Sequence, residues 1–142
     1  MDLKFAKEML ETGGYTCVIT DGVTVFSSTL RGVRPLVQFV EKKNIPAGFL
    51  AADKVVGRAT AYLYVLLRIR ALYVNVISES AVEVLKEYGI EVHYESLVPH
   101  IINRRGDGIC PFEEAVMDLC DPLAAYDAIL KRMQALHIPI WD

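Results

Sequence analysis

Histidine and cysteine are scarce in this chain of 142 residues, which has three of each. The histidines are scattered, and none has a carboxylate or cysteine at the spacing of a metal site on a helix. The cysteines, Cys17, Cys110 and Cys120, are odd in number and also lack metal-type spacing, which favours reduced thiols. The sequence therefore predicts no metal site, no disulfide framework and no cofactor.

Long apolar runs and an excess of positive charge are also missing. The longest apolar stretch, residues 59–67, is bounded by Arg58 and Arg68 and is far too short to span a membrane. The net charge of −3 and the isoelectric point near 5.6 argue against a nucleic-acid platform. Residues 1–8 have the pattern of an amphipathic helix rather than a signal peptide, so we expect a cytoplasmic protein.

Apolar residues, by contrast, are abundant. Hydrophobic residues make up 53% of the chain, charged residues only 23%, and the mean hydropathy is +0.29. Either the core is large or a second subunit covers apolar surface, and we expect a homo-oligomer. The length predicts one domain, residues 1–142, with enough chain for a substantial core.

Hydrophobic periodicity and turn residues predict an alternation of helices and strands. Asp21-Gly22 is typical of a type I′ hairpin turn, and Ser80 with Glu83 forms a capping-box pattern. The expected helices are 2–11, 32–43, 54–68, 80–88, one from Pro111, and 122–136; the expected strands are 15–20, 23–26, 47–51, 71–77 and 90–94. Strands joined through helices imply parallel or mixed pairing, so we predict a three-layer α/β/α sandwich around a five-stranded mixed sheet.

The most informative stretch is residues 51–59, where a predicted strand leads directly into a helix. Asp53 stands where an N-cap is wanted, whereas Lys54 opposes the helix dipole and Gly57 lowers helix propensity. Because Lys54 and Gly57 do not help the helix, they suggest a site that binds an anion at the helix N-terminus. The alternative is an ordinary N-cap, a solvated lysine and a glycine packed against a neighbouring strand.

Four segments carry a resemblance to a known family: Gly32–Leu36, Asp53–Ala59, Asn103-Arg104 and Gly108–Glu113. They resemble, in the same order, a small uncharacterised bacterial family assigned to the cytidine-deaminase-like fold. The resemblance implies that fold for most of the chain. It implies no activity, because the family has none established.

Deaminases of that fold bind zinc at two helix starts, with a His or Cys followed by a catalytic Glu at one and Pro-Cys-x-x-Cys at the other. The resemblance places these starts near residues 29–35 and 53–57. Neither stretch holds the histidine, cysteine or glutamate that zinc-dependent deamination needs. The resemblance therefore implies the fold and argues against that chemistry.

The residues around 27–34 are a second candidate part of the site. Ser27, Ser28, Arg31, Gly32 and Arg34 lie between the hairpin and the next helix. The implied fold makes this helix start face the start of the helix at Asp53, so hydroxyl and guanidinium groups would form a pocket for phosphate or carboxylate. The alternative is a capped helix with surface arginines.

Two further segments contribute candidates. Cys110, before Pro111, would be an N-cap whose thiolate the helix dipole favours, which would make it a nucleophile. Glu113 would face a ligand, or alternatively cap the helix as in an ordinary N-terminus. Asn103 and Arg104 lie beside glycines in a polar loop that suits anion recognition, or alternatively in a solvated loop.

The sequence leads to two functional hypotheses. The first is a zinc-free deaminase-like domain that binds a small anionic metabolite, such as a nucleotide, at paired helix N-termini. If it is an enzyme, the candidate catalytic residues are Asp53 as acid or base, Lys54, and Cys110 as nucleophile. The second is a non-catalytic binding or assembly module, suggested by the apolar composition and the missing zinc ligands.

Overall fold

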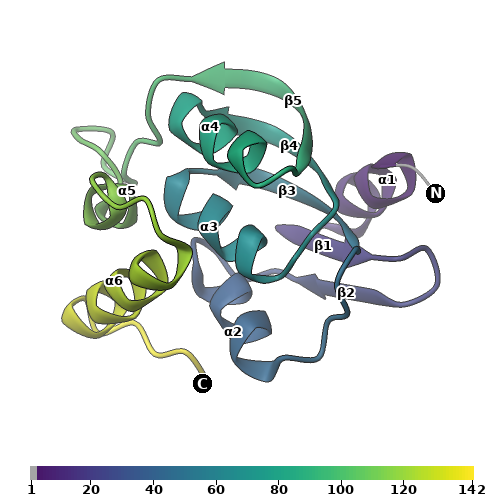
Figure 1. The fold of residues 1–142 in the computed structure, drawn as a ribbon, viewed down its shortest axis with the longest axis horizontal. Helices are drawn as coiled ribbons and strands as arrows, with labels where there is room; N and C mark the ends of the chain where they lie inside the picture. Colours follow the sequence, from purple (N-terminus) through teal and green to yellow (C-terminus); the bar gives the residue numbers. More distant parts are fainter. Residues whose placement is uncertain (1–2) are drawn as a thin grey trace.

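A five-stranded mixed sheet forms the centre of the computed structural model, which describes residues 3–142 (Figure 1). The strand order is β2-β1-β3-β4-β5. β1 is antiparallel to both of its neighbours, whereas β3, β4 and β5 run parallel. The strands are β1 (Cys17–Thr20), β2 (Val25–Ser28), β3 (Leu50–Val56), β4 (Ala71–Ser78) and β5 (Glu91–Val98).

The helices cover the two faces of this sheet unequally. They are α1 (Leu3–Gly13), α2 (Arg34–Lys42), α3 (Arg58–Leu66), α4 (Glu79–Glu87), α5 (Pro111–Val116) and α6 (Pro122–Ala135). The main core joins α2, α3 and α4 to one face, and α5 and α6 pack against α3 (Figure 1). On the other face, α1 places Ala6 and Leu10 against Val18, Ala52 and Tyr73.

The predicted mixed sheet and the order of its elements are confirmed, and several boundaries agree closely. The strand predicted at 71–77 is Ala71–Ser78, and the final helix predicted at 122–136 is Pro122–Ala135. The first helix is also present, although Met1 and Asp2 lie outside the described residues. The fifth strand extends to Val98, beyond its expected end at residue 94.

The predicted boundary between residues 47 and 68 is wrong. β3 begins at Leu50 and continues through Val56, and α3 begins only at Arg58. Asp53 is therefore inside a strand and is not an N-cap; its backbone is paired with Cys17 of β1 and Val74 of β4. Two neighbouring strands and the β-branched Val55-Val56 keep this segment extended, which outweighs the cap signal of an aspartate.

The predictions for the hairpin turn and for the start of α4 are also wrong. The hairpin has a four-residue connection, 21–24, in place of a two-residue type I′ turn, because the Asp21 carboxylate accepts hydrogen bonds from Val23 N and Thr24 N. Helix α4 begins two residues earlier than the capping box at Ser80 implied. Its N-cap is Ser78, whose hydroxyl accepts from Ala81 N, while Ser80 accepts from Arg58.

A carboxylate from α5 holds the start of α3. Glu113 is buried, and its two oxygens accept hydrogen bonds from Arg58 N at 2.8 Å and Ala59 N at 3.0 Å. These are two of the donors that a helix N-terminus leaves without an intrahelical partner. The negative charge also lies at the favourable end of the helix dipole. The contact joins segments that are 55 residues apart in the sequence.

The side chain of Arg58 links the start of α3 to two further segments, the start of α4 and the turn after α5. Its guanidinium donates to Ser80 Oγ at 2.9 Å, to Tyr62 Oη at 3.0 Å and to the carbonyl oxygens of Val116 and Leu119. We call Arg58 and Glu113 together the α3 clasp. It fixes the starts of α3 and α4 and the turn after α5 relative to one another.

Gly57 is the N-cap of α3, and the α3 clasp explains why it is glycine. Its backbone is extended, with φ −103° and ψ −172°, so no left-handed conformation demands glycine. A Cβ at this position would lie 2.3 Å from the Glu113 carboxylate. The missing side chain therefore makes room for an internal acid.

None of the helices formed by residues 3–142 combines the length and the apolar character needed to cross a membrane.

We predict that Glu113→Gln lowers the free energy of unfolding by about 1–3 kcal/mol. Glutamine has one acceptor oxygen, and its amide NH₂ group would face a backbone N–H that now donates to a carboxylate. Chemical denaturation measures the effect. The control is Glu114→Gln, which removes only an exposed ion pair with Arg132 and should change stability by less than about 0.5 kcal/mol. Equal effects of the two substitutions would contradict a role of Glu113 in holding α3.

Candidate functional site

Two adjoining cavities open on the side of the molecule that carries α5 and the loop before it. The inner cavity has a volume of about 420 Å³ and reaches β1 and β3. The outer cavity, of about 810 Å³, reaches the segment after α6. Both are lined by Leu30, Arg31, Gly32, Val33, Ile102, Arg104, Cys110 and Phe112. This shared lining makes the two cavities parts of one cleft.

Three chain segments contribute most of the lining of the cleft. The first is the connection 29–33 before α2, where Gly32 has φ +69°, a left-handed conformation that favours glycine. The second is the end of β3 with the start of α3, and the third is the loop 101–110 before α5. Residues of the two regions 29–35 and 53–57, which the fold implied by the resemblance makes face each other, thus line the same inner cavity.

Asp53 is the chemically most distinctive residue of the inner cavity. Its side chain is only 8% exposed and belongs to the lining. Tyr64 Oη donates to Oδ2 at 2.6 Å, and Val55 N donates to Oδ1 at 3.2 Å. Burial raises the pKa of Asp53 from its ordinary value of 3.8 to about 7, although these hydrogen bonds favour the charged form. A buried acid that titrates near neutrality suits proton transfer.

Cys17 and Tyr64 surround this carboxyl group with further weak acids. Burial, and then the charge of Asp53, raise the pKa of the Cys17 thiol and of the Tyr64 hydroxyl well above their ordinary values. Both therefore stay protonated at neutral pH. Tyr64 donates its hydroxyl proton to the charged form of Asp53, which fixes the orientation of the carboxylate.

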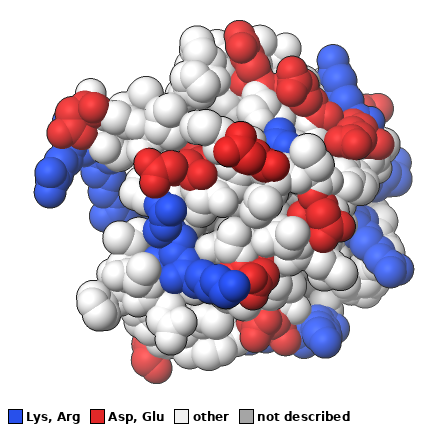
Figure 2. All heavy atoms as spheres, turned by 60° about the vertical axis from the view of Figure 1, so that its left-hand side comes forward, with Lys and Arg blue, Asp and Glu red and all other residues white. Residues whose placement is uncertain are grey.

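Basic side chains lie at the exposed end of the cleft. Lys54, Arg31 and Arg104 are exposed and line the inner cavity. Arg31 and Arg104 also line the outer cavity. Figure 2 shows that Lys and Arg side chains gather on this side of the molecule, bordered by Asp and Glu. The cleft therefore has a buried acid at one end and cationic groups toward solvent.

The predicted use of the α3 N-terminus for a ligand needs correction. Gly57 and Glu113 line the inner cavity, as expected for site residues. However, the Glu113 carboxylate already accepts from Arg58 N and Ala59 N. The anion at this helix start is therefore a side chain of the protein, and these two backbone donors are engaged with it.

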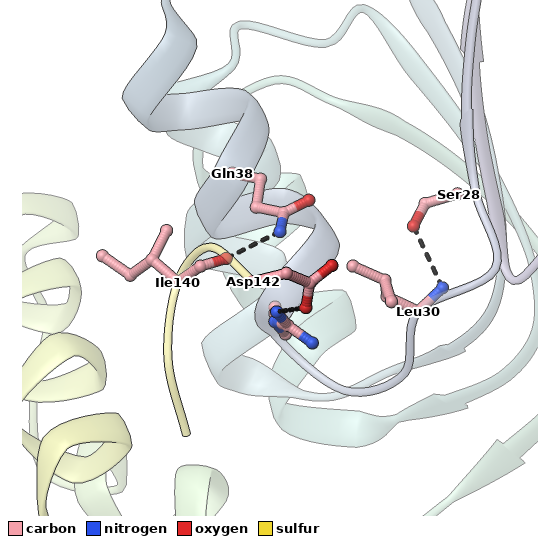
Figure 3. Close-up of polar contacts among 6 residues, drawn as sticks. Ser28, Leu30, Gln38, Ile140 and Asp142 are labelled. Carbon is pink, nitrogen blue, oxygen red and sulfur yellow. Dashed lines mark hydrogen bonds and ion pairs between the residues drawn. The ribbon is translucent and has the colours of Figure 1, made fainter. Parts of the chain in front are cut away.

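The remaining predicted residues occupy different positions relative to the cleft. Cys110 is the N-cap of α5 and lines both cavities, half-buried, although its side chain forms no capping hydrogen bond. Asn103 lines the outer cavity, but its side chain mainly shapes the loop, accepting from Gly106 N and donating to Asp107 Oδ1. Ser28 does not line either cavity; its hydroxyl accepts from Leu30 N (Figure 3).

Arg34 also lines the outer cavity. Its guanidinium is largely buried, and Nη2 donates to the Asp142 carboxylate at 2.5 Å. The arginine that the sequence assigned to a ligand anion is therefore paired with a carboxylate of the same chain.

Sequence reasoning missed four residues near Asp53. The sequence favoured a reduced thiol for Cys17 and gave no role in the site to Tyr64, Thr16 or Thr60. Thr16, Cys17 and Thr60 line the inner cavity, and Tyr64 bonds to Asp53. A correct boundary for β3 would have placed Asp53 opposite Cys17, because antiparallel neighbours share a face of the sheet.

A zinc centre of the deaminase type does not fit these residues. Across residues 3–142, no group of three or more His, Cys, Asp and Glu side chains is arranged to hold a metal ion. The implied fold would place zinc ligands in the stretches 29–35 and 53–57. Among His, Cys, Asp and Glu, these two stretches contain only Asp53. Its oxygens are engaged with Tyr64 and Val55.

The fold and the cleft define a mixed α/β domain with a largely apolar cavity, in which a few polar groups lie beside the end of β3 and the start of α3. The sequence profile of a domain of unknown function, DUF1893 (TM1506), matches residues 5–133, so the chain belongs to that family. It is similar to the crystal structure of a DUF1893 family protein, TM1506, from Thermotoga maritima, with a TM-score of 0.85 and 27% identity over 92% of this chain and 88% of that one. No curated protein matches the chain.

We predict that the stability of Asp53→Asn and of the wild type diverge with pH. The folded-state pKa of Asp53 lies above the unfolded value, so its favourable contribution is complete below about pH 4 and is lost as the pH rises to about 7. Relative to the uncharged asparagine variant, the wild type should lose up to about 4 kcal/mol across this interval.

Urea denaturation at intervals from pH 4.5 to 8 checks this prediction. Subtracting the free energies of unfolding of the two proteins at each pH cancels the contributions of the other titrating groups. Curves that stay parallel across this range would contradict a buried Asp53 that titrates near neutrality.

Proposed function

We propose that the cleft binds a small anionic metabolite, such as a nucleotide. The observation that best supports this proposal is the distribution of charge along the cleft. The buried Asp53 lies at the inner end, and the exposed Lys54, Arg31 and Arg104 lie nearer to solvent. Lysine and arginine suit phosphate and carboxylate groups, and arginine can bind them through two N–H groups. The inner cavity of about 420 Å³ is within the usual size of small-molecule sites.

The lining between the two ends supports a ligand with an apolar or flat body. Leu30, Val33, Ile101, Ile102 and Phe112 form much of the wall. Ligand pockets are commonly built in this way, with apolar walls and a few polar groups that fix orientation. The anionic group would lie among the basic residues, and the other end would lie toward Asp53.

If the bound molecule reacts, Asp53 is the best candidate for moving a proton. It needs to change charge near neutral pH, which its burial favours, and Tyr64 holds its orientation. Lys54 would neutralise the ligand. Cys110 lines both cavities and is the candidate nucleophile.

The proposal includes a finer assignment of the fold, as a zinc-free domain of the cytidine-deaminase-like type and a three-layer sandwich. It is supported by the strand order β2-β1-β3-β4-β5 with parallel β3, β4 and β5, and by helices on both faces of the sheet. The assignment as zinc-free is supported by the residues at the two helix starts, which lack the ligands that a deaminase zinc site needs.

We predict that a nucleotide or another phosphorylated metabolite raises the melting temperature of the wild type. Lys54→Ala and Arg104→Ala should each weaken this binding by about tenfold, because each removes a cationic partner of the anion. A thermal-shift titration measures both effects. Lys86→Ala is the matched control, since Lys86 is exposed on α4 and lines neither cavity. The proposal fails if no such compound stabilises the wild type more than Lys54→Ala.

A second candidate function is a non-catalytic assembly module that forms a homo-oligomer. β5 is an edge strand of eight residues, so one side of its backbone has no strand partner among residues 3–142. Tyr94 and Leu97 on this strand are 42% and 45% exposed. An exposed edge of this kind can pair with the same strand of another copy.

Assembly through β5 predicts that light scattering detects a discrete oligomer in the wild type and a smaller species in Leu97→Lys. A charge at an edge strand opposes pairing between copies. Leu123→Lys is the control, because Leu123 is more exposed, at 69%, but lies on α6. A monomeric wild type, or an equal effect of both substitutions, would contradict assembly through this edge.

A further inference from the structure

The chain after α6 turns back across α2 (Figure 3), and three different contacts hold it there. Gln38 Nε2 donates to the carbonyl oxygen of Ile140 at 2.6 Å. Arg34 Nη2 donates to Asp142 Oδ1 at 2.5 Å. Lys42 Nζ lies 5.4 Å from the centre of the Trp141 ring. We call residues 136–142 the C-terminal segment.

The C-terminal segment forms part of the wall of the outer cavity. Leu136 and Ile138 line this cavity together with Arg34. Asp142 therefore places a carboxylate on a guanidinium that belongs to the cleft. An anion from outside would meet Arg34 only in competition with Asp142.

The guanidinium of Arg34 is incompletely satisfied by this ion pair. Asp142 contacts Nη2, whereas Arg34 Nε is buried and has no hydrogen-bond partner within residues 3–142. A buried donor without an acceptor is unfavourable. Phosphate and carboxylate groups bind arginine best through two parallel N–H groups, and Nε with Nη2 forms one such pair.

Asp142 itself is held weakly. Its side chain is 91% exposed, and Trp141 beside it is 45% exposed. Ion pairs with an exposed partner contribute little to stability and are weakened by salt. The contact is therefore one that a better anion can replace.

We propose that Arg34 is an anion subsite of the outer cavity, that Asp142 occupies it in the free protein, and that a phosphate or carboxylate group bound to Arg34 displaces the C-terminal segment. The subsite rests on the proposed function, because it treats the cleft as a binding site. A bound anion would use Nε and Nη2 together, and release of the segment would widen the outer cavity.

Trp141 makes this displacement measurable, because it is the only tryptophan of the chain and lies next to Asp142. The experiment follows its fluorescence, and its quenching by acrylamide, while inorganic phosphate is titrated at constant ionic strength. In the wild type, phosphate should shift the emission to the red and increase quenching. Asp142→Asn should show this released state without phosphate, and calorimetry should find that it binds phosphate about two- to fivefold more tightly.

Two further variants distinguish displacement of the C-terminal segment from a general effect of phosphate on the protein. Arg34→Gln should also give the released emission, and phosphate should change it no further. Asp127→Asn, which removes the exposed acid of the Lys131 ion pair on α6, should behave as the wild type. Wild-type emission in Asp142→Asn without phosphate, or an equal response to phosphate in Arg34→Gln and wild type, would overturn the subsite.

The outcome is distinguishable from that of the proposed function. Release by phosphate without stabilisation by any nucleotide or phosphorylated metabolite would support the Arg34 subsite and count against the proposed ligand class. Stabilisation by such a ligand at Lys54 and Arg104, with unchanged Trp141 fluorescence, would support the ligand class and overturn the subsite.

Discussion

The burial of the Glu113 carboxylate against the start of α3 is the interaction on which the geometry of the cleft depends. Its two hydrogen bonds to Arg58 N and Ala59 N fix α5 beside the end of β3. The loop before α5 supplies Ile102, Arg104 and Cys110 to both cavities, so its position follows from the same contact. The α3 clasp therefore has a structural role, and through it the clasp determines the shape of the site.

Electrostatics inside the cleft follow from which groups the sheet buries. Asp53 is buried because β3 lies between two other strands and Tyr64 of α3 covers its carboxyl group. Lys54, the next residue along the strand, is exposed. One dipeptide thus supplies both a buried acid with a raised pKa and a solvated cation to the same cavity.

The sequence predicted the order of the elements, because periodicity and turn residues act locally, and several of the residues that it named as candidates line the cleft. It failed where tertiary partners decide. Asp53 looked like an N-cap, but pairing with Cys17 and Val74 keeps it in a strand. Gly57 looked like a ligand contact, whereas its lack of a side chain accommodates Glu113. The ion pair of Arg34 with Asp142 joins positions 108 residues apart, and no local pattern indicates it.

The α3 clasp also has a consequence for the order in which the chain acquires its structure during synthesis. The acceptor for Arg58 N and Ala59 N, the Glu113 carboxylate, is synthesised 55 and 54 residues later. The Arg58 side chain likewise needs the carbonyl groups of Val116 and Leu119. Domains tend to fold as units once their chain has emerged. A nascent chain that has emerged only as far as β5 therefore lacks the partners of the α3 start, and the wall of the cleft is complete only after α5 and the turn that follows it have emerged.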